Sequence, residues 1–216
     1  MLAIATGTGI WIDAARMLNL YLAPRGFRAP VPAESAVTAL TEFLVNEGLV
    51  GRFDDAGYAP GPSVSRLFHA DALDSHLPAE LTFDALRIVS VPRARFLPEN
   101  APPGTLRAAC GECGDVLEPE AIDEAISRLR FLPPERVTLT CPGCRAVSEL
   151  RTVEFEHPVA FARFWIFIEG AGLSRLNHGL VERMGRLLGV QLVVVVEVPA
   201  ESVEDWVPAR RVLRRR

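Results

Sequence analysis

The four cysteines of the chain fall into two pairs of identical internal spacing, and they are the residues whose chemistry the sequence indicates best. Cys110 and Cys113 lie in AACGECGD, and Cys141 and Cys144 lie in CPGC. A C-x-x-C turn places both sulfurs within reach of one ion, and the adjacent glycine or proline favours the tight backbone it needs. Two such turns supply four thiolates, the tetrahedral set that selects zinc or iron. The spacing therefore predicts one metal site with these four cysteines as ligands.

A site of this composition has a limited range of chemistry. With four cysteine ligands a zinc ion has no open coordination position, so it is structural and activates no water. Thiol redox chemistry would instead need a C-x-x-C pair at the start of a helix that follows a strand, and it would leave the second pair unexplained. We therefore predict one structural zinc per chain, with iron as the less favoured metal.

The pattern Cys110-Gly-Glu-Cys113-Gly with Cys141-Pro-Gly-Cys144 resembles the zinc ribbon, and its spacing is also similar to that of rubredoxins. The resemblance covers only residues 105–156, called here the four-cysteine module. A zinc ribbon implies a cysteine turn at the tip of each of two hairpins, with TLRAA before the first turn and VTLT and VSELRTV flanking the second.

The sequence departs from rubredoxins in three respects. A helix-like insert separates the two pairs, and Arg145 stands where a second glycine is usual. No aromatic cluster is expected around the site, because Phe131 is the only aromatic residue between Phe96 and Phe155. These departures favour zinc and leave a rubredoxin-like electron carrier as an alternative.

A second motif lies near the start of the chain. ATGTGIWIDAA resembles the glycine-rich turn of Rossmann-like methyltransferases, which implies S-adenosylmethionine binding at Gly7 and Gly9. That family also needs a second strand ending in an acid that binds the ribose. The corresponding region, residues 22–35, is broken by prolines, so this enzyme activity is retained only as an alternative.

No catalytic residue is predicted. All 23 basic residues are arginine, which excludes Walker-type phosphate loops, Schiff-base lysines and Ser-x-x-Lys acyl enzymes as they are normally built. The segment HADALDSH, 69–76, holds two histidines seven positions apart, about 10 Å along a helix, which is too far to share one ion. His157 and His178 have no motif partner. The pattern favours a protein that is not an enzyme.

Hydrophobic periodicity predicts the elements that must position the cysteines. Residues 1–23 are expected to form either a short strand and a helix or one continuous helix, with Met17, Leu18 and Tyr21 on its apolar face. The other predicted elements are a helix at 34–47 with Gly48 just past its end, a hairpin around 54–57, a helix at 63–76, a buried strand at 86–91 ended by Pro92, a helix at 118–132, a strand at 147–156, and a terminal strand, helix and strand at 161–169, 176–188 and 190–198. If the two terminal strands are neighbours in one sheet, they run parallel with a right-handed crossover.

These elements predict an α+β fold in several parts. They comprise a mixed N-terminal α/β region at 1–98, a proline-rich linker at 99–105, the four-cysteine module at 105–156, a C-terminal β-α-β unit at 157–200 that packs on the rest, and an arginine-rich tail at 207–216.

The charge and composition of the chain indicate which partners and which cellular compartment to expect. The formal net charge is −4, and removing the five arginines of the last seven residues leaves −9 on the remainder. An acidic body does not favour nucleic acid, except through the arginine tail. No signal-peptide leader and no membrane-length apolar run are recognised, and paired cysteines are typical of a reducing compartment, so we expect a cytoplasmic protein.

The leading functional hypothesis is a non-catalytic, zinc-stabilised protein that acts through protein–protein contacts as an accessory or inhibitory partner. The alternative is a zinc-ribbon regulator that binds nucleic acid, with the helix and hairpin at 34–60 as part of a winged helix. The electron carrier and the S-adenosylmethionine enzyme remain as further alternatives.

Overall fold

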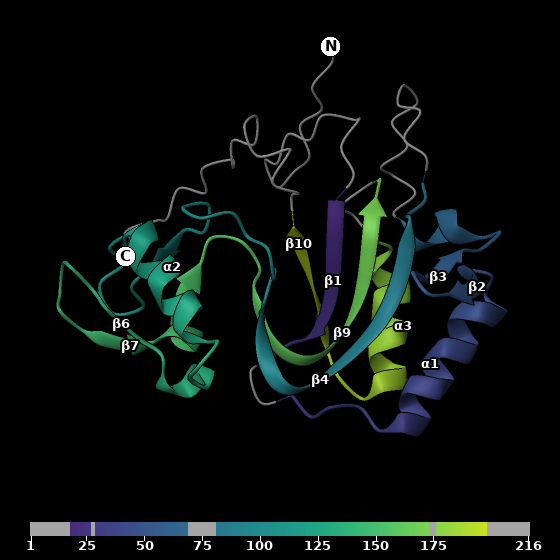
Figure 1. The fold of residues 1–216 in the computed structure, drawn as a ribbon, viewed down its shortest axis with the longest axis horizontal. Coiled ribbons are helices and arrows are strands. Elements are labelled where there is room, and N and C mark those ends of the chain that lie inside the picture. Colours follow the sequence, from purple (N-terminus) through teal and green to yellow (C-terminus); the bar gives the residue numbers. More distant parts are fainter. Residues whose placement is uncertain (1–17, 27–28, 69–80, 173–175, 198–216) are drawn as a thin grey trace, which may run out of the picture.

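A computed structural model of the chain describes residues 18–26, 29–68, 81–172 and 176–197 (Figure 1). The strands are β1 (Leu18–Pro24), β2 (Val50–Asp54), β3 (Gly57–Pro60), β4 (Ala85–Leu97), β5 (Ala108–Ala109), β6 (Thr138–Thr140), β7 (Val147–Glu149), β8 (Glu154–Phe155), β9 (Ala160–Ala171) and β10 (Leu192–Glu197). The α-helices are α1 (Glu34–Asn46), α2 (Pro119–Arg128) and α3 (His178–Leu188), and 3₁₀ turns cover Val64–Leu67, Pro134–Arg136 and Leu150–Thr152. Helices and antiparallel sheets occur together, which confirms the α+β class.

The main sheet has six strands in the order β10-β1-β9-β4-β3-β2. β1 pairs antiparallel with β10 on one side and with β9 on the other, and β9 pairs antiparallel with β4. The terminal strands β9 and β10 therefore run in the same direction without being neighbours, because β1 lies between them. Together with α1 and α3, this gives a split β-α-β arrangement of the ferredoxin-like kind, extended by the β2–β3 hairpin.

The segment Leu18–Pro24 is a strand, whereas both alternatives for the first 23 residues made it helical. Leucine-rich sequence favours a helix by propensity, but here pairing with strands on both sides decides the conformation. Leu20 and Leu22 enter the core beneath the helices, and Tyr21 and Ala23 enter a second apolar cluster with Trp165. A strand that is buried on both faces lacks the alternation that would have identified it.

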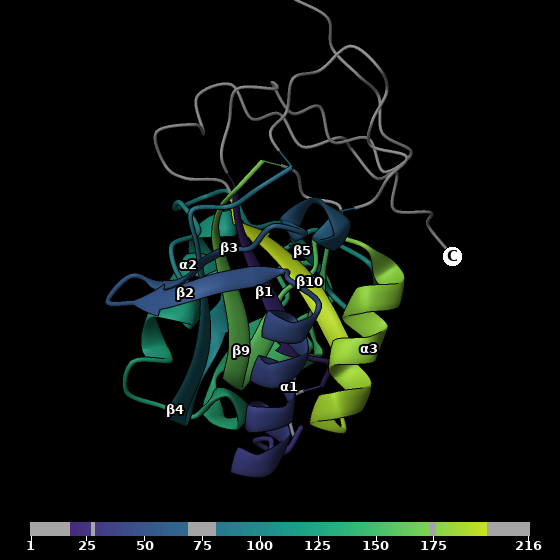
Figure 2. The same ribbon diagram turned by 90° about the vertical axis from the view of Figure 1, so that its right-hand side faces the viewer.

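Helices α1 and α3 pack side by side on one face of the main sheet (Figure 2). α1 buries Leu40, Phe43 and Leu44 against the sheet, whereas Val45 is exposed. α3 begins at Asn177, whose side chain accepts a hydrogen bond from the Leu180 N–H, and ends at Gly189, which has a φ of 68°. Both helices and the hairpin between β2 and β3 are therefore as predicted.

Strand β4 continues beyond Pro92, so the prediction that proline ends this strand is wrong. The register with β9 shifts between Ser90 and Arg95, so that residues 91–94 bulge opposite Arg163. Proline has no N–H to donate to a ladder, and a bulge is one of the few places in a sheet that tolerates it. Between Leu86 and Phe96 the residues of the strand are exposed or only partly buried, so the prediction of a buried strand at 86–91 is also wrong.

Two further elements of the structure differ from their predictions. The segment 147–156 is not one strand, because β7 pairs with β6 whereas β8 pairs with β5. The chain must turn between these partners, and it does so in the 3₁₀ turn that buries Leu150. Of the helix predicted at 63–76, only the 3₁₀ turn Val64–Leu67 lies in the described residues.

The four-cysteine module connects the C-terminal end of β4 to the N-terminal end of β9 and lies beside the main sheet (Figure 1). The module has its own apolar core, to which α2 contributes Ile122 and Ala125. Phe96 of β4 and Phe161 of β9 belong to this core and not to that of the main sheet. The module is thus built on strands that continue from the main sheet, and the predicted domain boundaries remain predictions.

Within the described part of the chain, no helix has the length and apolar character needed to cross a membrane.

Candidate metal centre

The two cysteine turns have the same backbone hydrogen-bond pattern. In the first turn Gly114 N–H donates to Cys110 O at 2.9 Å, and Cys110 N–H donates to Asp115 O at 2.9 Å. In the second turn the equivalent bonds are Arg145 N–H to Cys141 O at 3.0 Å and Cys141 N–H to Ala146 O at 2.9 Å. The second turn is the tip of the β6–β7 hairpin, and the first follows β5. Both pairs therefore occupy hairpin-like turns, as the resemblance to the zinc ribbon implies.

The fourth residue after the first cysteine of each turn has a left-handed conformation. Gly114 has a φ of 77°, and Arg145 at the equivalent place has a φ of 62°. Arg145 is the only non-glycine residue of the described chain with a positive φ. The glycine expected at this position is thus absent from the second turn, and the arginine adopts a conformation that costs a residue with a Cβ about 1–2 kcal/mol.

We predict that Arg145→Gly stabilises the four-cysteine module by about 0.5–1 kcal/mol, because the relief of left-handed strain exceeds the extra chain entropy of glycine. The converse substitution at the equivalent position of the first turn, Gly114→Ala, should destabilise the module by about 1 kcal/mol or more. Denaturant unfolding of the metal-loaded protein measures both changes. Destabilisation by Arg145→Gly would show instead that the arginine side chain contributes more than its backbone conformation costs.

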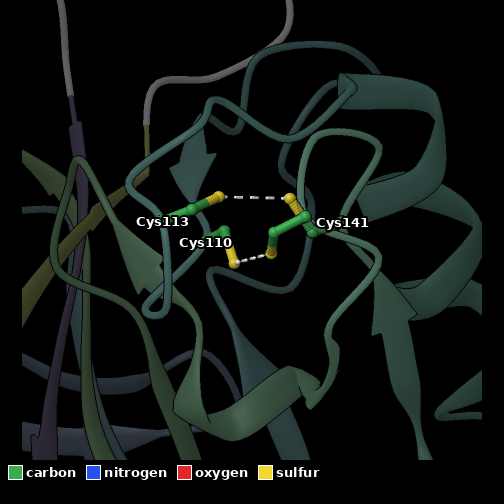
Figure 3. A group of neighbouring side chains, drawn as sticks. Cys110, Cys113 and Cys141 are labelled. Carbon is green, nitrogen blue, oxygen red and sulfur yellow. Dashed lines mark hydrogen bonds between the residues drawn. The ribbon is translucent and has the colours of Figure 1, made fainter.

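The four sulfur atoms converge on one point between the two turns. The Sγ atoms of Cys110 and Cys144 are 3.8 Å apart, and those of Cys113 and Cys141 are 3.6 Å apart (Figure 3). All four lie within 4.8 Å of one another. Zn–S bonds of about 2.3 Å place the sulfurs of a tetrahedron about 3.8 Å apart, whereas a disulfide requires about 2.05 Å. The spacing is therefore that of a metal-ligand set, and all four cysteines are free thiols.

The site lies at the surface of the module. Cys110 and Cys141, the first cysteine of each turn, are 3% and 2% exposed and belong to its apolar core. Cys113 and Cys144 are exposed. An ion at this point would therefore connect the core of the module to its outer loops.

The second turn also directs backbone N–H groups at its sulfur atoms. A hydrogen bond from Cys144 N–H, opposed by burial and aided by Gly143 N–H and the thiols of Cys113 and Cys144, lowers the pKa of Cys141 to about 7. The pKa of Cys113 is lowered by its largest single influence, the N–H of Asp115, but burial and the neighbouring thiols raise it overall to about 12. The thiol of Cys141 thus ionises readily, and a metal ion would displace the proton that Cys113 retains.

Close packing joins the two turns directly. A Cβ placed on Gly143 would overlap with Oδ2 of Asp115, so the carboxylate of the first turn occupies the space beside the second. This contact accounts for glycine within CPGC, which the sequence alone did not explain.

Three aromatic residues contribute to the apolar core to which Cys110 and Cys141 belong. Phe96, Phe155 and Phe161 pack together, with ring centroids 5.9 Å and 5.3 Å from Phe96, in the same core as Cys110 and Cys141. Residues distant in sequence come together because β4, β8 and β9 meet at the module. The choice of zinc therefore depends on the ligand set and not on the absence of aromatic side chains.

Of the other candidate residues, the two described histidines do not join this site. His178 is exposed at the start of α3 and lies 3.6 Å from Glu182. His157 is partly buried just before β9, and its burial lowers its pKa. Gly7, Gly9, the segment 69–76 and the arginine tail lie outside the described residues.

Sequence reasoning missed a buried carboxylate at the end of β10. Glu197 is 2% exposed. Its carboxylate accepts hydrogen bonds from Tyr21 Oη at 2.6 Å, Asn19 Nδ2 at 3.0 Å and the backbone N–H of Asn100 at 3.0 Å. An acid at the end of the apolar run VVVV was the available signal, but its partners are distant in sequence. The hydrogen bond from Asn100 holds the loop that leads into the four-cysteine module against β10 of the main sheet.

Comparison of the chain with models of known protein families, with curated proteins and with solved structures found no significant match.

Proposed function

We propose that the four-cysteine module is a zinc ribbon with one structural zinc ion, and that the protein acts without catalysis through protein–protein contacts, as an accessory or inhibitory partner. The observation that carries the metal assignment is the convergence of four sulfur atoms with cross-turn distances of 3.6 Å and 3.8 Å. Those distances match the tetrahedral sulfur spacing expected around zinc.

Zinc is favoured over iron by general affinity. Sites of a given ligand type bind Zn²⁺ more tightly than Fe²⁺, and thiolates accept both metals. The phenylalanine cluster and the exposed Cys113 and Cys144 keep an iron-based electron carrier as the second candidate. A visible spectrum distinguishes the two candidates, because an iron–tetrathiolate site absorbs visible light and a zinc–tetrathiolate site does not.

The non-catalytic assignment is supported by the closed ligand set. Four cysteine ligands leave no position at which zinc could activate water or substrate. The three cavities whose linings are described contain none of the cysteines. In the described residues the metal site and the cavities are therefore separate features.

A role in protein contacts is supported by exposed apolar side chains on a chain of acidic net charge. Phe131 is 85% exposed and Phe53 is 64% exposed, and aromatic residues are enriched at protein interfaces relative to the rest of the surface.

The functional proposal is tested with the full chain as bait in extracts of its native cells, followed by size-exclusion chromatography. We expect a protein that co-elutes with the chain at a fixed ratio and survives nuclease treatment. A nuclease-sensitive complex would support the nucleic-acid regulator. Elution of the chain alone, together with S-adenosylmethionine-dependent thermal stabilisation that Gly7→Ala abolishes, would support the methyl-donor enzyme.

A further inference from the structure

Two adjoining cavities open between strand β4 and the turn that follows helix α2. Their volumes are about 680 Å³ and 580 Å³, and both are lined by Arg93, Ala94, Leu129 and Arg130. Arg163 of β9 and Phe131 line the second cavity. We call this continuous surface the arginine groove.

The groove lies at the irregularity in β4, whose residues 91–94 line it. Residues 91–94 bulge out of register opposite Arg163, so the ladder is interrupted where Pro92 cannot donate a hydrogen bond. Arg93 and Arg163 thereby come to the same break in the sheet. The opposite wall is the turn after α2, in which the Phe131 and Leu132 N–H groups bond to Arg128 O.

Three arginines of the groove are exposed and form no ion pair with any described residue. They are Arg93, Arg130 and Arg163. Arg95, in contrast, pairs with Glu99 at 3.0 Å, and the carboxylate of Asp123 accepts a bond from Gly104 N–H at 2.7 Å. The guanidinium groups that remain are therefore available to a carboxylate from outside.

The groove also has an apolar rim. Phe131 is 85% exposed and Leu132 is 38% exposed, and both line the second cavity with Pro133 and Pro134. Exposed aromatic residues beside arginines are the residue types enriched at the centres of protein interfaces.

We propose that the arginine groove binds an acidic segment of a partner protein, with carboxylates on Arg93, Arg130 and Arg163 and an apolar side chain against Phe131. The inference rests on the proposed function and identifies the surface that makes the contact. A protein segment fits better than nucleic acid because Glu99, Asp123 and Glu135 also line the groove. Their carboxylates would repel a continuous phosphate backbone, whereas a peptide can place its few acids beside the free arginines.

The test pans a displayed library of random 12-residue peptides against the full, zinc-loaded chain at physiological salt. We expect enriched peptides with a net negative charge and at least one large apolar residue. Synthetic copies of them should bind at least tenfold more weakly to the variant Arg93→Glu/Arg130→Glu/Arg163→Glu, and Phe131→Ala should weaken binding several-fold. The matched control is Arg52→Glu/Arg107→Glu/Arg186→Glu, which reverses as many exposed arginines outside the groove and should leave binding within twofold.

Each other outcome overturns the inference. Enriched peptides that are not acidic, or that bind the groove variant as tightly as the unmodified chain, assign the contact to another surface and leave the proposed function intact. If no peptide is enriched and no protein co-elutes from native extracts, both the arginine-groove inference and the proposed function are wrong. Salt-sensitive binding of a DNA duplex that the groove variant abolishes would assign the groove to nucleic acid. Circular dichroism and zinc content of the variants show that folding is retained.

Discussion

Replacing Cys141 by serine is expected to release the metal and unfold the four-cysteine module while the main sheet stays folded. In zinc-finger peptides the binding of zinc supplies about 10–16 kcal/mol of folding free energy, and removal of one thiolate ligand weakens that binding. Cys141 is 2% exposed and belongs to the core of the module, so the substitution also places a hydroxyl where a thiol packed. Hydrogen exchange should become fast across 105–156, whereas α3 and β10 keep their protection.

The control is Thr140→Ser, the exposed neighbour on β6, which removes one methyl group and leaves the ligands intact. It should change neither metal content nor exchange. A strong chelator added to the unmodified protein should reproduce the effect of Cys141→Ser. Full exchange protection of the module without metal would contradict a structural role for the ion.

Replacing Glu197 by alanine is expected to give the second large effect, a destabilisation of the main sheet by about 3 kcal/mol. The substitution leaves Tyr21 Oη, Asn19 Nδ2 and the N–H of Asn100 without their shared acceptor, and each buried donor left unsatisfied costs about 1–3 kcal/mol. Glu197→Gln keeps an acceptor at the same place and should cost less. Glu154→Ala, on the exposed side of β8, is the matched control and should change stability by less than about 0.5 kcal/mol. Denaturant unfolding measures all three, and equal stability of Glu197→Ala and the control would contradict the account of this cluster.

The same cluster predicts a loss of stability in alkali. Burial first, and then the hydrogen bond to Glu197, raise the pKa of Tyr21 far above its ordinary range. The folded state therefore holds the phenol proton more tightly than the unfolded chain, in which it titrates at about pH 10. The stabilisation is complete below pH 10 and declines as the pH rises above it. Tyr21→Phe should flatten this decline, as stability curves between pH 8 and 11 would show.

Local patterns in the sequence predicted the parts of the molecule that depend on neighbouring residues. The turns around Cys110 and Cys141 follow from spacing and from backbone preference, and α1 and α3 follow from their apolar faces. The convergence of the two turns was also predictable, because two thiol pairs without a common ion would be an unusual use of four cysteines.

Features that depend on distant pairing could not be predicted in the same way. β1 is a strand because β9 and β10, more than 130 residues later, pair with its two edges. Pro92 is tolerated within β4 because Arg163 lies opposite a bulge, which no local signal marks. The carboxylate cluster of Glu197 and the arginine groove are likewise assembled from strands and loops that only the folded sheet brings together.

The metal content of the purified chain tests the central claim most directly. Elemental analysis by mass spectrometry, together with a thiol titration and a visible spectrum, should find one zinc per chain, four thiols protected until the metal is removed, and no colour. Stoichiometric iron with visible absorption would contradict the zinc assignment. A metal-free chain with four freely reactive thiols would contradict the metal site itself.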